Sequence, residues 1–287
     1  MTAAGMEVVA VRVPERSWRS EARSVRIIWR RDLIRFVDDP TRILSWLIQP
    51  MLFLFVVGTG LQTLSAGASH GVDLTTFIFP GVVCMALVFS AMFSAASLVW
   101  DRELGFLREL MVAPISRSSI IVGKCLGGAT IAASQGVIVL ALAGLVHVPY
   151  DPVLLLGVFG LQLLIAFTIT AFGIMVAATI KQAQTFTHVV QMLVMPMVFL
   201  SGALYPVAGL SPWLGVLTRL NPLTYAVDPM RRLVFAHLDV SAAARQTLAP
   251  GVTWWSWRVP SFVEAGLVLA IGIGMLGFAI VRFSRTE

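Results

Sequence analysis

The segment that decides the fold is Asp101-Arg102-Glu103-Leu104-Gly105-Phe106-Leu107-Arg108-Glu109-Leu110-Met111-Val112-Ala113-Pro114-Ile115-Ser116-Arg117, which lies between two long apolar runs. Five of its first nine residues are charged. At about 2.5–3.5 kcal/mol for each charge at the bilayer centre, burying them in lipid would cost on the order of 10 kcal/mol or more. We therefore expect this segment to lie in water. Its apolar side chains recur at helical spacing and predict a short amphipathic helix, ended by Pro114, whose stripe contacts a partner: Leu104, Leu107, Leu110 and Met111.

The composition around this segment is that of an integral membrane protein. Hydrophobic residues make up 57% of the chain and charged residues 13%, with a mean hydropathy of +0.86, whereas soluble domains have about 25% charged residues. The net charge of +6 follows membrane topology, because nine of the 21 Lys and Arg fall in residues 1–42. A nucleic-acid partner is not expected, since that would need basic residues gathered on one folded surface.

Uncharged or nearly uncharged runs long enough to cross the hydrocarbon predict six transmembrane helices in an all-α fold, at 43–61, 76–100, 118–146, 153–180, 182–204 and 260–281. Gly and Pro interrupt 205–259, which we interpret as outer re-entrant helices and a loop. With six spans, 16 of the 21 basic residues lie on the side of both termini, which the positive-inside rule assigns to the cytoplasm. The Arg and Ala bias indicates a bacterial inner membrane, and we treat 1–287 as one transmembrane domain.

Residues 1–42 are expected to form a cytoplasmic tail and an interfacial amphipathic helix. One helical face is apolar, with Val25, Ile28, Trp29, Leu33, Phe36 and Val37, and the other carries Arg23, Arg26, Arg30, Arg31 and Arg35. Such a helix lies in the interface plane, with its apolar side in the acyl boundary and its arginines toward anionic headgroups. Asp38-Asp39-Pro40 ends it, because proline disfavours helical geometry at the residue before it.

The sequence offers no catalytic or metal centre of its own. Gly123-Lys124 invites comparison with a P-loop, but the pattern fails at Ser118 and Cys125. We interpret Lys124 as a lysine that reaches the interface from the inner end of the third span. Cys84 and Cys125 lie in or beside apolar runs and are expected to be small buried hydrophobes, and a metal site there would lack further ligands. The chain is thus not expected to be an enzyme or to bind a cofactor alone.

A few polar residues inside the apolar runs remain open to more than one interpretation. Ser261 and Glu264 have the spacing of a capping box at the start of the last span, although a proton or substrate role for Glu264 stays possible. His188 and Gln191 give the fifth span a polar inner half, which suits either interhelical hydrogen bonds or the lining of a substrate route. Gln49 precedes Pro50, where we expect a kink. The small residues Gly123, Gly127, Gly128 and Gly136 predict close helix packing.

The charged segment resembles part of a known family of membrane proteins. Asp101-Arg102-Glu103-x-Gly105-Phe106-Leu107-Arg108-Glu109-Leu110, with Ala113-Pro114-x-Ser116-Arg117, resembles the segment after the second span of type 2 permeases of ATP-binding-cassette (ABC) transporters. A second region, from Leu200-Ser201-Gly202-Ala203-Leu204-Tyr205-Pro206 through Asn221-Pro222-Leu223-Thr224-Tyr225 to Asp228 and Arg231, resembles the signature around that family's fifth span. The resemblance runs from Arg23 to the C-terminus and is greatest to the daunorubicin-resistance and nodulation-type export permeases.

The resemblance implies a type V ABC exporter fold in which the permease pairs with a second copy, as a homodimer or a heterodimer, and with two cytoplasmic ATPase subunits that bind ATP and Mg. Such a complex moves a lipid, glycoconjugate or drug-like amphipathic molecule outward. It also implies that 101–117 holds the coupling helix that contacts the ATPase, together with the interfacial helix. The residues so implied for docking are Arg102, Glu103, Gly105, Phe106, Leu107, Arg108, Glu109 and Leu110, with Arg26, Trp29, Arg30 and Leu33 in the interfacial helix.

Candidate residues for the pathway and its outer gate are Gln49, His188, Gln191, Tyr205, Pro206, Asn221 and Tyr225. Two other function classes stay open. A secondary transporter would be expected to carry ionisable groups near the midplane and paired half-repeats, which are not visible in the sequence. A membrane anchor for a cytoplasmic partner would need a docking helix but not the interrupted segment 205–227. The substrate itself cannot be deduced from these residues.

Overall fold

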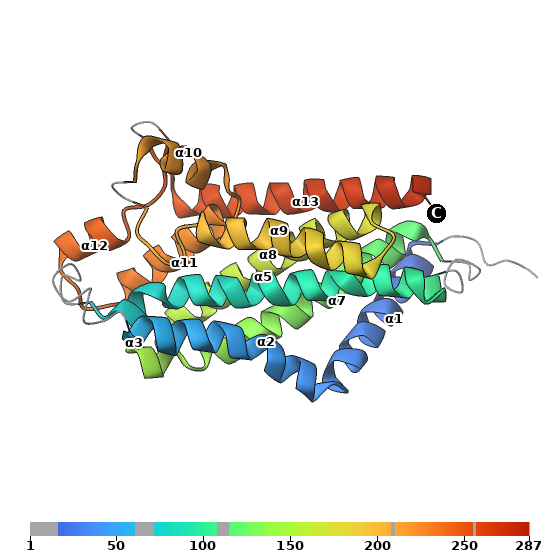
Figure 1. The fold of residues 1–287 in the computed structure, drawn as a ribbon, viewed down its shortest axis with the longest axis horizontal. Coiled ribbons are helices and arrows are strands. Elements are labelled where there is room, and N and C mark those ends of the chain that lie inside the picture. Colours follow the sequence, from blue (N-terminus) through green and yellow to red (C-terminus); the bar gives the residue numbers. More distant parts are fainter. Residues whose placement is uncertain (1–16, 61–71, 108–114, 208–209, 255–256, 287) are drawn as a thin grey trace, which may run out of the picture.

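The computed structural model describes residues 17–60, 72–107, 115–207, 210–254 and 257–286. These residues form a predominantly helical bundle in which the long helices lie side by side (Figure 1). The helices in chain order are α1 (Trp18–Val37), α2 (Pro40–Leu52), α3 (Gly58–Gly60), α5 (Leu74–Glu103), α7 (Arg117–Leu140), α8 (Pro152–Thr179), α9 (Ala183–Phe199), α10 (Pro212–Leu220), α11 (Thr224–Ala236), α12 (Ala242–Leu248) and α13 (Ser261–Thr286). A π-helical stretch, Phe53–Val57, joins α2 to α3; a 3-10 turn, Ala143–Val146, follows α7; β1 (Thr253–Trp254) pairs antiparallel with β2 (Trp257–Arg258).

Within the described residues, five helical segments are long and apolar enough to cross a membrane. They are Ile43–Gly60, Leu74–Glu103, Arg117–Leu140, Pro152–Thr179 and Ser261–Arg285. The predicted fifth span, 182–204, corresponds to α9, an apolar helix of 17 residues. At about 1.5 Å per residue, α9 covers roughly 25 Å, less than the roughly 30 Å of hydrocarbon. It ends at Phe199 and is followed by a turn in which Gly202 has a φ of +73°. A count of six spans therefore stays a prediction.

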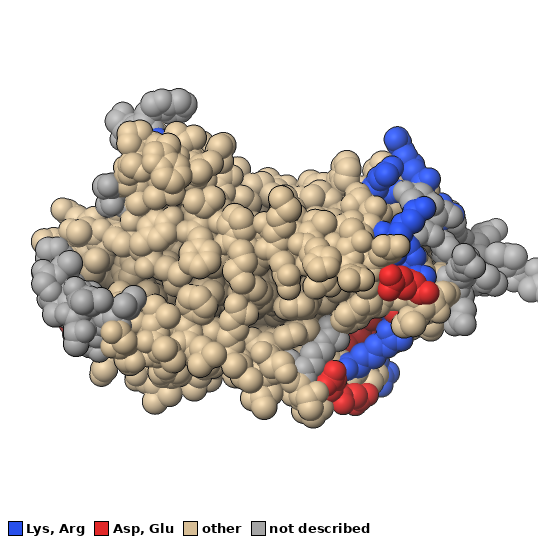
Figure 2. All heavy atoms as spheres, in the orientation of Figure 1, with Lys and Arg blue, Asp and Glu red and all other residues tan. Residues whose placement is uncertain are grey.

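Helix α5 is the centre of the bundle. Of its most apolar 18 residues, 83% are buried, compared with 17% for the segment containing α2 and 22% for α13. It packs against α2, α7, α8 and α9, while α13 packs on α7 and α8. The peripheral helices leave broad apolar surfaces, and Figure 2 shows charged side chains gathered at the end of the molecule where α1 and the end of α13 lie. This distribution fits an apolar band in lipid with a charged end in water.

Glycines of α7 allow its neighbours to approach closely, as the small-residue pattern predicts. A Cβ at Gly123 would lie 2.9 Å from the Cβ of Ile28, and one at Gly127 would lie 3.2 Å from the Cβ of Asp32. Both contacts are with α1. The expectation that the apolar face of α1 lies among acyl chains was therefore wrong for its central part, because Ile28 is buried in the bundle and Phe36 is buried as well. Helix α1 ends at Val37, as the Asp-Asp-Pro sequence predicts.

The segment that follows α9 forms a cap at the end of the bundle opposite α1 (Figure 1). It contains α10, α11, α12 and the β1–β2 hairpin, and α11 packs against α5, α8 and α13. The turn before α10 lies directly on α5 at Gly81, where a Cβ would overlap the carbonyl oxygen of Ala203. Residues 205–227 thus form a turn, α10 and the start of α11 rather than a further span within the described residues.

Candidate functional site

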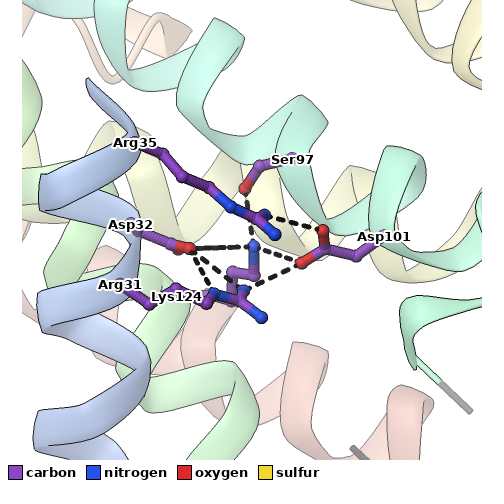
Figure 3. Close-up of polar contacts among 6 residues, drawn as sticks. All are labelled: Arg31, Asp32, Arg35, Ser97, Asp101 and Lys124. Atoms are coloured by element: carbon purple, nitrogen blue, oxygen red, sulfur yellow. Dashed lines mark hydrogen bonds and ion pairs between the residues drawn. The ribbon is translucent and has the colours of Figure 1, made fainter. Parts of the chain in front are cut away.

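A buried group of charges joins α1, α5 and α7, and we call it the α1–α5–α7 ion cluster. Its members are Arg31, Asp32, Arg35, Ser97, Asp101 and Lys124 (Figure 3). The Nζ of Lys124 lies 2.7 Å from Oδ2 of Asp101 and 3.3 Å from Oδ2 of Asp32. The guanidinium of Arg31 bridges the same two carboxylates, 2.9 Å from Asp101 and 3.0 Å from Asp32. Arg35 Nη1 lies 3.2 Å from Oδ1 of Asp101.

The cluster is shielded from solvent, although it is built from charges. The exposed fraction of the side chain is 1% for Lys124, 5% for Asp101 and 8% for Asp32. The interpretation of Lys124 as a lysine that reaches the interface was wrong, because two carboxylates and the hydroxyl of Ser97, 3.0 Å from Nζ, surround its ammonium group. Buried charges persist only where they are paired and hydrogen-bonded. The expectation that Asp101 lies in water was likewise wrong.

The charged segment begins as the last turn of α5, and helical conformation resumes at Phe106 and Leu107 after a break at Gly105. Asp101, Arg102 and Glu103 belong to α5, which ends at Glu103, and Gly105 just beyond it has a φ of +78°. Leu104 is 82% exposed and Leu107 is 1% exposed, so they do not share the outward stripe that their spacing predicted. Leu107 is therefore covered by the chain itself in this conformation. The candidates Arg108, Glu109 and Leu110 lie outside the described residues.

Arg102 and Glu103 contact the connection between α8 and α9. Arg102 Nη1 donates to the carbonyl oxygens of Ala177, at 3.1 Å, and Ile180, at 2.5 Å. Glu103 Oε1 accepts a hydrogen bond from the backbone N–H of Ala183 at 2.8 Å. A cation at a helix C-terminus and a carboxylate at a helix N-terminus each satisfy backbone groups that lack an intrahelical partner. The end of α5 is thus bound to four other helices, α1, α7, α8 and α9.

Phe106 lies beside the ion cluster, where two cations contact its ring. The guanidinium carbon of Arg31 lies 4.8 Å from the ring centroid, and that of Arg35 lies 5.4 Å from it. These are cation–π distances. Gly105 and Phe106 are both half-buried. Among the docking candidates that the structure describes, Glu103 is the one whose side chain is exposed, and Leu104 beside it is exposed as well.

The predicted interfacial residues of α1 divide between two surroundings. Arg26 and Arg30 are exposed. Leu33 and Trp29 are half-buried, and the Trp29 indole N–H donates to Oγ1 of Thr130 on α7 at 3.1 Å. Helix α1 therefore presents arginines outward while its opposite face is fixed on α7.

The pathway candidates are not brought together by the fold. Gln191 lines a cavity of about 260 Å³ between α2, α5 and α9, with Trp46, Phe93 and Trp100. His188, one turn away, is exposed, and Gln49 is half-buried in α2. Any route that includes Gln191 would pass along this aromatic-lined cavity. Cofactor or metal ligands are not gathered either: no group of three or more His, Cys, Asp or Glu that could hold a metal occurs in the described part of the chain.

The remaining pathway candidates belong to the cap. Asn221 Nδ2 donates to the carbonyl oxygen of Met197 at 2.6 Å, and its Oδ1 accepts from the N–H of Leu223 at 3.0 Å. The Tyr225 hydroxyl donates to the Arg219 carbonyl oxygen at 2.8 Å and accepts from the Trp254 indole N–H at 2.9 Å. Tyr205 and Pro206 are half-buried in the turn before α10. Asn221 and Tyr225 therefore hold the cap together in this conformation.

Arg231 fixes the cap to the rest of the bundle. It is 2% exposed and donates to the carbonyl oxygens of Gly202 at 2.7 Å and Ala203 at 3.0 Å. Its guanidinium lies 4.3 Å from the ring centroid of Phe77 on α5. Burial lowers the pKa of Arg231 to about 10, which still leaves it protonated at neutral pH. Asp228 pairs with Arg232, whose Nε lies 2.9 Å from Oδ2, and the same oxygen accepts from the N–H of Val252 at 3.3 Å.

Glu264 belongs to the same group of charges and does not cap α13. Its Oε2 lies 2.6 Å from Nη2 of Arg232, and its side chain is fully buried. The carbonyl oxygen of Pro260 accepts from the N–H of Glu264 at 3.2 Å, so Pro260 takes the capping position and Ser261 is the first helical residue. The capping-box prediction was wrong, because a buried carboxylate binds the arginine that faces it rather than an exposed helix end. Nothing in the sequence placed Arg232 near Glu264.

Comparison with known proteins agrees with the resemblance. The family model described as "ABC-2 type transporter" matches residues 23–235. A ycf38 protein of Cyanophora paradoxa, named as a transport permease, is 29% identical over 211 residues, 72% of each chain. Nodulation protein J of Neorhizobium galegae is 26% identical over 73% of this chain and 80% of its own. The inner membrane transport permease YadH of Escherichia coli K12 is 25% identical over 72% of this chain and 81% of its own. The chain therefore belongs to the ABC-2 type transporter family, as a multi-pass membrane permease.

Proposed function

We propose that this chain is the transmembrane subunit of an ABC exporter, in which a separate ATPase drives outward movement of an amphipathic lipid, glycoconjugate or drug-like molecule. Two copies of the permease and two ATPase subunits would form the complex in a bacterial inner membrane, and ATP and Mg would be bound by the ATPase. Relatives named nodulation protein J and multidrug ABC transporter permease YbhR support an exporter of this kind.

The observation that carries the proposal is the placement of the end of α5. Asp101, Arg102 and Glu103 are consecutive, and their side chains contact α1 and α7, the end of α8, and the start of α9, respectively. An ATPase that moves the exposed turn after Glu103 would therefore displace four other helices at once. Packed interfaces with charged contacts change between discrete arrangements rather than deforming continuously, which suits a two-state transport cycle.

The charge distribution supports a cytoplasmic location for this end. Figure 2 shows basic side chains around α1 and the end of α13. Nη1 of Arg117, at the start of α7, donates to the Ser284 carbonyl oxygen of α13 at 2.7 Å. The positive-inside rule then assigns both termini and the turn after α5 to the cytoplasm. Leu104, 82% exposed, is the natural contact point for the ATPase.

Site-directed cross-linking tests the proposal. Leu104→Cys should cross-link to the ATPase in the assembled complex, and a nucleotide that closes the ATPase should change the yield. The two native cysteines, Cys84 and Cys125, are buried and give little background. Leu220→Cys, at an equally exposed site in the cap (75%), is the matched control and should give no ATPase adduct. Equal yields at both positions, or none at Leu104→Cys, would contradict the assignment.

A transport assay separates this proposal from a secondary transporter and from a membrane anchor. Proteoliposomes that contain the permease and its ATPase should move substrate only when ATP is hydrolysed. Movement driven by an ion gradient alone would favour a secondary transporter. ATPase binding without any movement of a range of amphipathic compounds would favour an anchor.

A further inference from the structure

A cavity of about 370 Å³ opens beside the α1–α5–α7 ion cluster. Five of its lining residues are polar or charged: Asp32, Arg35, Ser94, Ser97 and Asp101. Five are apolar or aromatic, namely Phe36, Trp100, Leu104, Phe106 and Ile131, and Gly128 completes the lining. Pockets that take small organic molecules run from about 300 to 1,000 Å³. Because the lining is both polar and apolar, an amphipathic ligand would fill the cavity best.

The charge of the cluster beside this cavity is unbalanced. Three cations, Arg31, Arg35 and Lys124, face two carboxylates, Asp32 and Asp101, which leaves one excess positive charge. Both carboxylates already accept from two or more cations, so the excess cannot be neutralised within the cluster. An excess positive charge at the edge of a low-dielectric site attracts an anion, because a counter-ion there lowers the positive potential. The side chain of Arg35 is 50% exposed and lines the cavity, so its guanidinium is accessible to a ligand.

A second observation points into the same cavity. Ser94 lines it and is 7% exposed, and its Oγ is buried without a hydrogen-bond partner among the described residues. Ser97 also lines the cavity, and its Oγ accepts from Lys124, which leaves its own hydroxyl hydrogen to donate. Two hydroxyl donors and a guanidinium around an excess positive charge are the donor set of a phosphate site.

We propose that this cavity binds the phosphate of an anionic amphiphile, with a phosphodiester on Arg35, Ser94 and Ser97 and an acyl chain along Phe36 and Ile131. A phosphodiester carries one negative charge and would neutralise the cluster. The site lies at the charged end of the bundle, where Trp100 lines it, and tryptophans at this depth mark the headgroup level of a membrane. Anionic lipids of the cytoplasmic leaflet are the source that the surroundings favour. The lipid would hold α1 against α5 and does not itself need to be transported, so the site is independent of the proposed function.

Thermal unfolding and native mass spectrometry of the purified full-length permease in a neutral detergent test this site. Short-chain phosphatidylglycerol should bind one molecule per chain and raise Tm. Phosphatidylcholine, which has no net charge, should bind about tenfold more weakly. Inorganic phosphate is the third probe. Saturation by inorganic phosphate at the same concentrations as phosphatidylglycerol would assign the site to a soluble phosphate and would contradict the proposal that an amphiphile binds there. Equal binding of the two lipids would overturn the charge argument.

Variants identify the residues. Arg35→Gln should weaken phosphatidylglycerol binding about tenfold or more, because it removes a charged hydrogen-bond donor and the excess charge. Arg35→Lys should keep most of the affinity. Arg30→Gln is the matched control for non-specific attraction, since Arg30 lies on the exposed side of α1, away from the cavity lining. Equal loss in Arg30→Gln and Arg35→Gln would overturn the site. If Arg35→Gln fails to fold, Ser94→Ala, which also removes a proposed donor, takes its place and should weaken phosphatidylglycerol binding; unchanged binding would overturn the site.

Discussion

Lys124 on α7 and Asp101 on α5 form a buried ion pair, with 2.7 Å between Nζ and Oδ2. Asp101 also accepts from Arg31 and Arg35 on α1. The carboxylate is therefore the common partner of cations from two helices, at the point where α5 leaves the bundle. A buried ion pair is weak support for net stability, but removal of one partner leaves an uncompensated charge. This asymmetry makes the pair a sensitive test of the structure.

Asp101→Asn should destabilise the protein by about 3–5 kcal/mol, because three cations would then share the single carboxylate of Asp32. Thermal unfolding in detergent measures the change. The double variant Asp101→Asn with Lys124→Met should lose less than the sum of the single variants, with a coupling of about 1 kcal/mol or more. Asp239→Asn is the control, since Asp239 is exposed, and should stay within about 0.5 kcal/mol. Additive losses would show that the two residues do not interact.

Gly81→Ala should destabilise the junction between α5 and the cap. A Cβ at this position overlaps the backbone carbonyl of Ala203, which Arg231 also binds, so neither side can move freely. Overpacking of this kind costs about 1–3 kcal/mol. Gly160→Ala in α8 is the matched control, because nothing lies within 4 Å of its Cβ, and it should be neutral or stabilise by up to about 1 kcal/mol. Equal unfolding temperatures for the two variants would contradict the close approach.

Glu264→Gln should cost about 1.5–3 kcal/mol, because it removes the charged acceptor of a buried hydrogen bond from Arg232. Ser261→Ala should change stability by no more than about 0.5 kcal/mol, since Ser261 is an exposed first residue of α13. Loss of a true N-cap would cost about 1 kcal/mol. A larger effect at Ser261 than at Glu264 would restore the capping box. Transport lost in Glu264→Gln at unchanged stability would instead favour a proton or substrate role.

The parts of the fold that depend on local sequence could be predicted. Three signals act over a few residues each: the apolar runs, the Asp-Asp-Pro sequence that ends α1, and the small residues of α7. The helices lie where the apolar runs predict them, α1 ends as predicted, and α7 packs closely on its neighbours. Family membership followed from the charged segment and the residues after α9, and the family comparison confirms it.

The pairing of charges could not be predicted, because it depends on helices that are distant in the sequence. Lys124 has no acidic neighbour within two turns of its own helix, so its interpretation as an interfacial lysine was reasonable. Its partners Asp32 and Asp101 come from α1 and α5. Asp32 is one acidic residue among the arginines of an amphipathic helix, so its sequence context did not indicate a buried position. The one available signal was the pair Gly123 and Gly127 in α7, which indicates that another helix packs closely but does not identify that helix.

Arg102→Ala should uncouple the end of α5 from α8 while the bundle stays folded. The substitution removes charged hydrogen bonds to the Ala177 and Ile180 carbonyl oxygens, and the buried core of α5 is not touched. In the assembled complex, substrate-stimulated ATP hydrolysis should therefore fall about tenfold or more, as expected when about 1.5–3 kcal/mol of charged hydrogen bonding is lost from a force-bearing contact. Lys181→Ala changes an exposed cation in the same connection and should leave stimulation intact. If both variants keep full stimulation at equal folded yield, the contact of Arg102 with α8 does not carry the motion, and Glu103 and the ion cluster on Asp101 are the remaining routes.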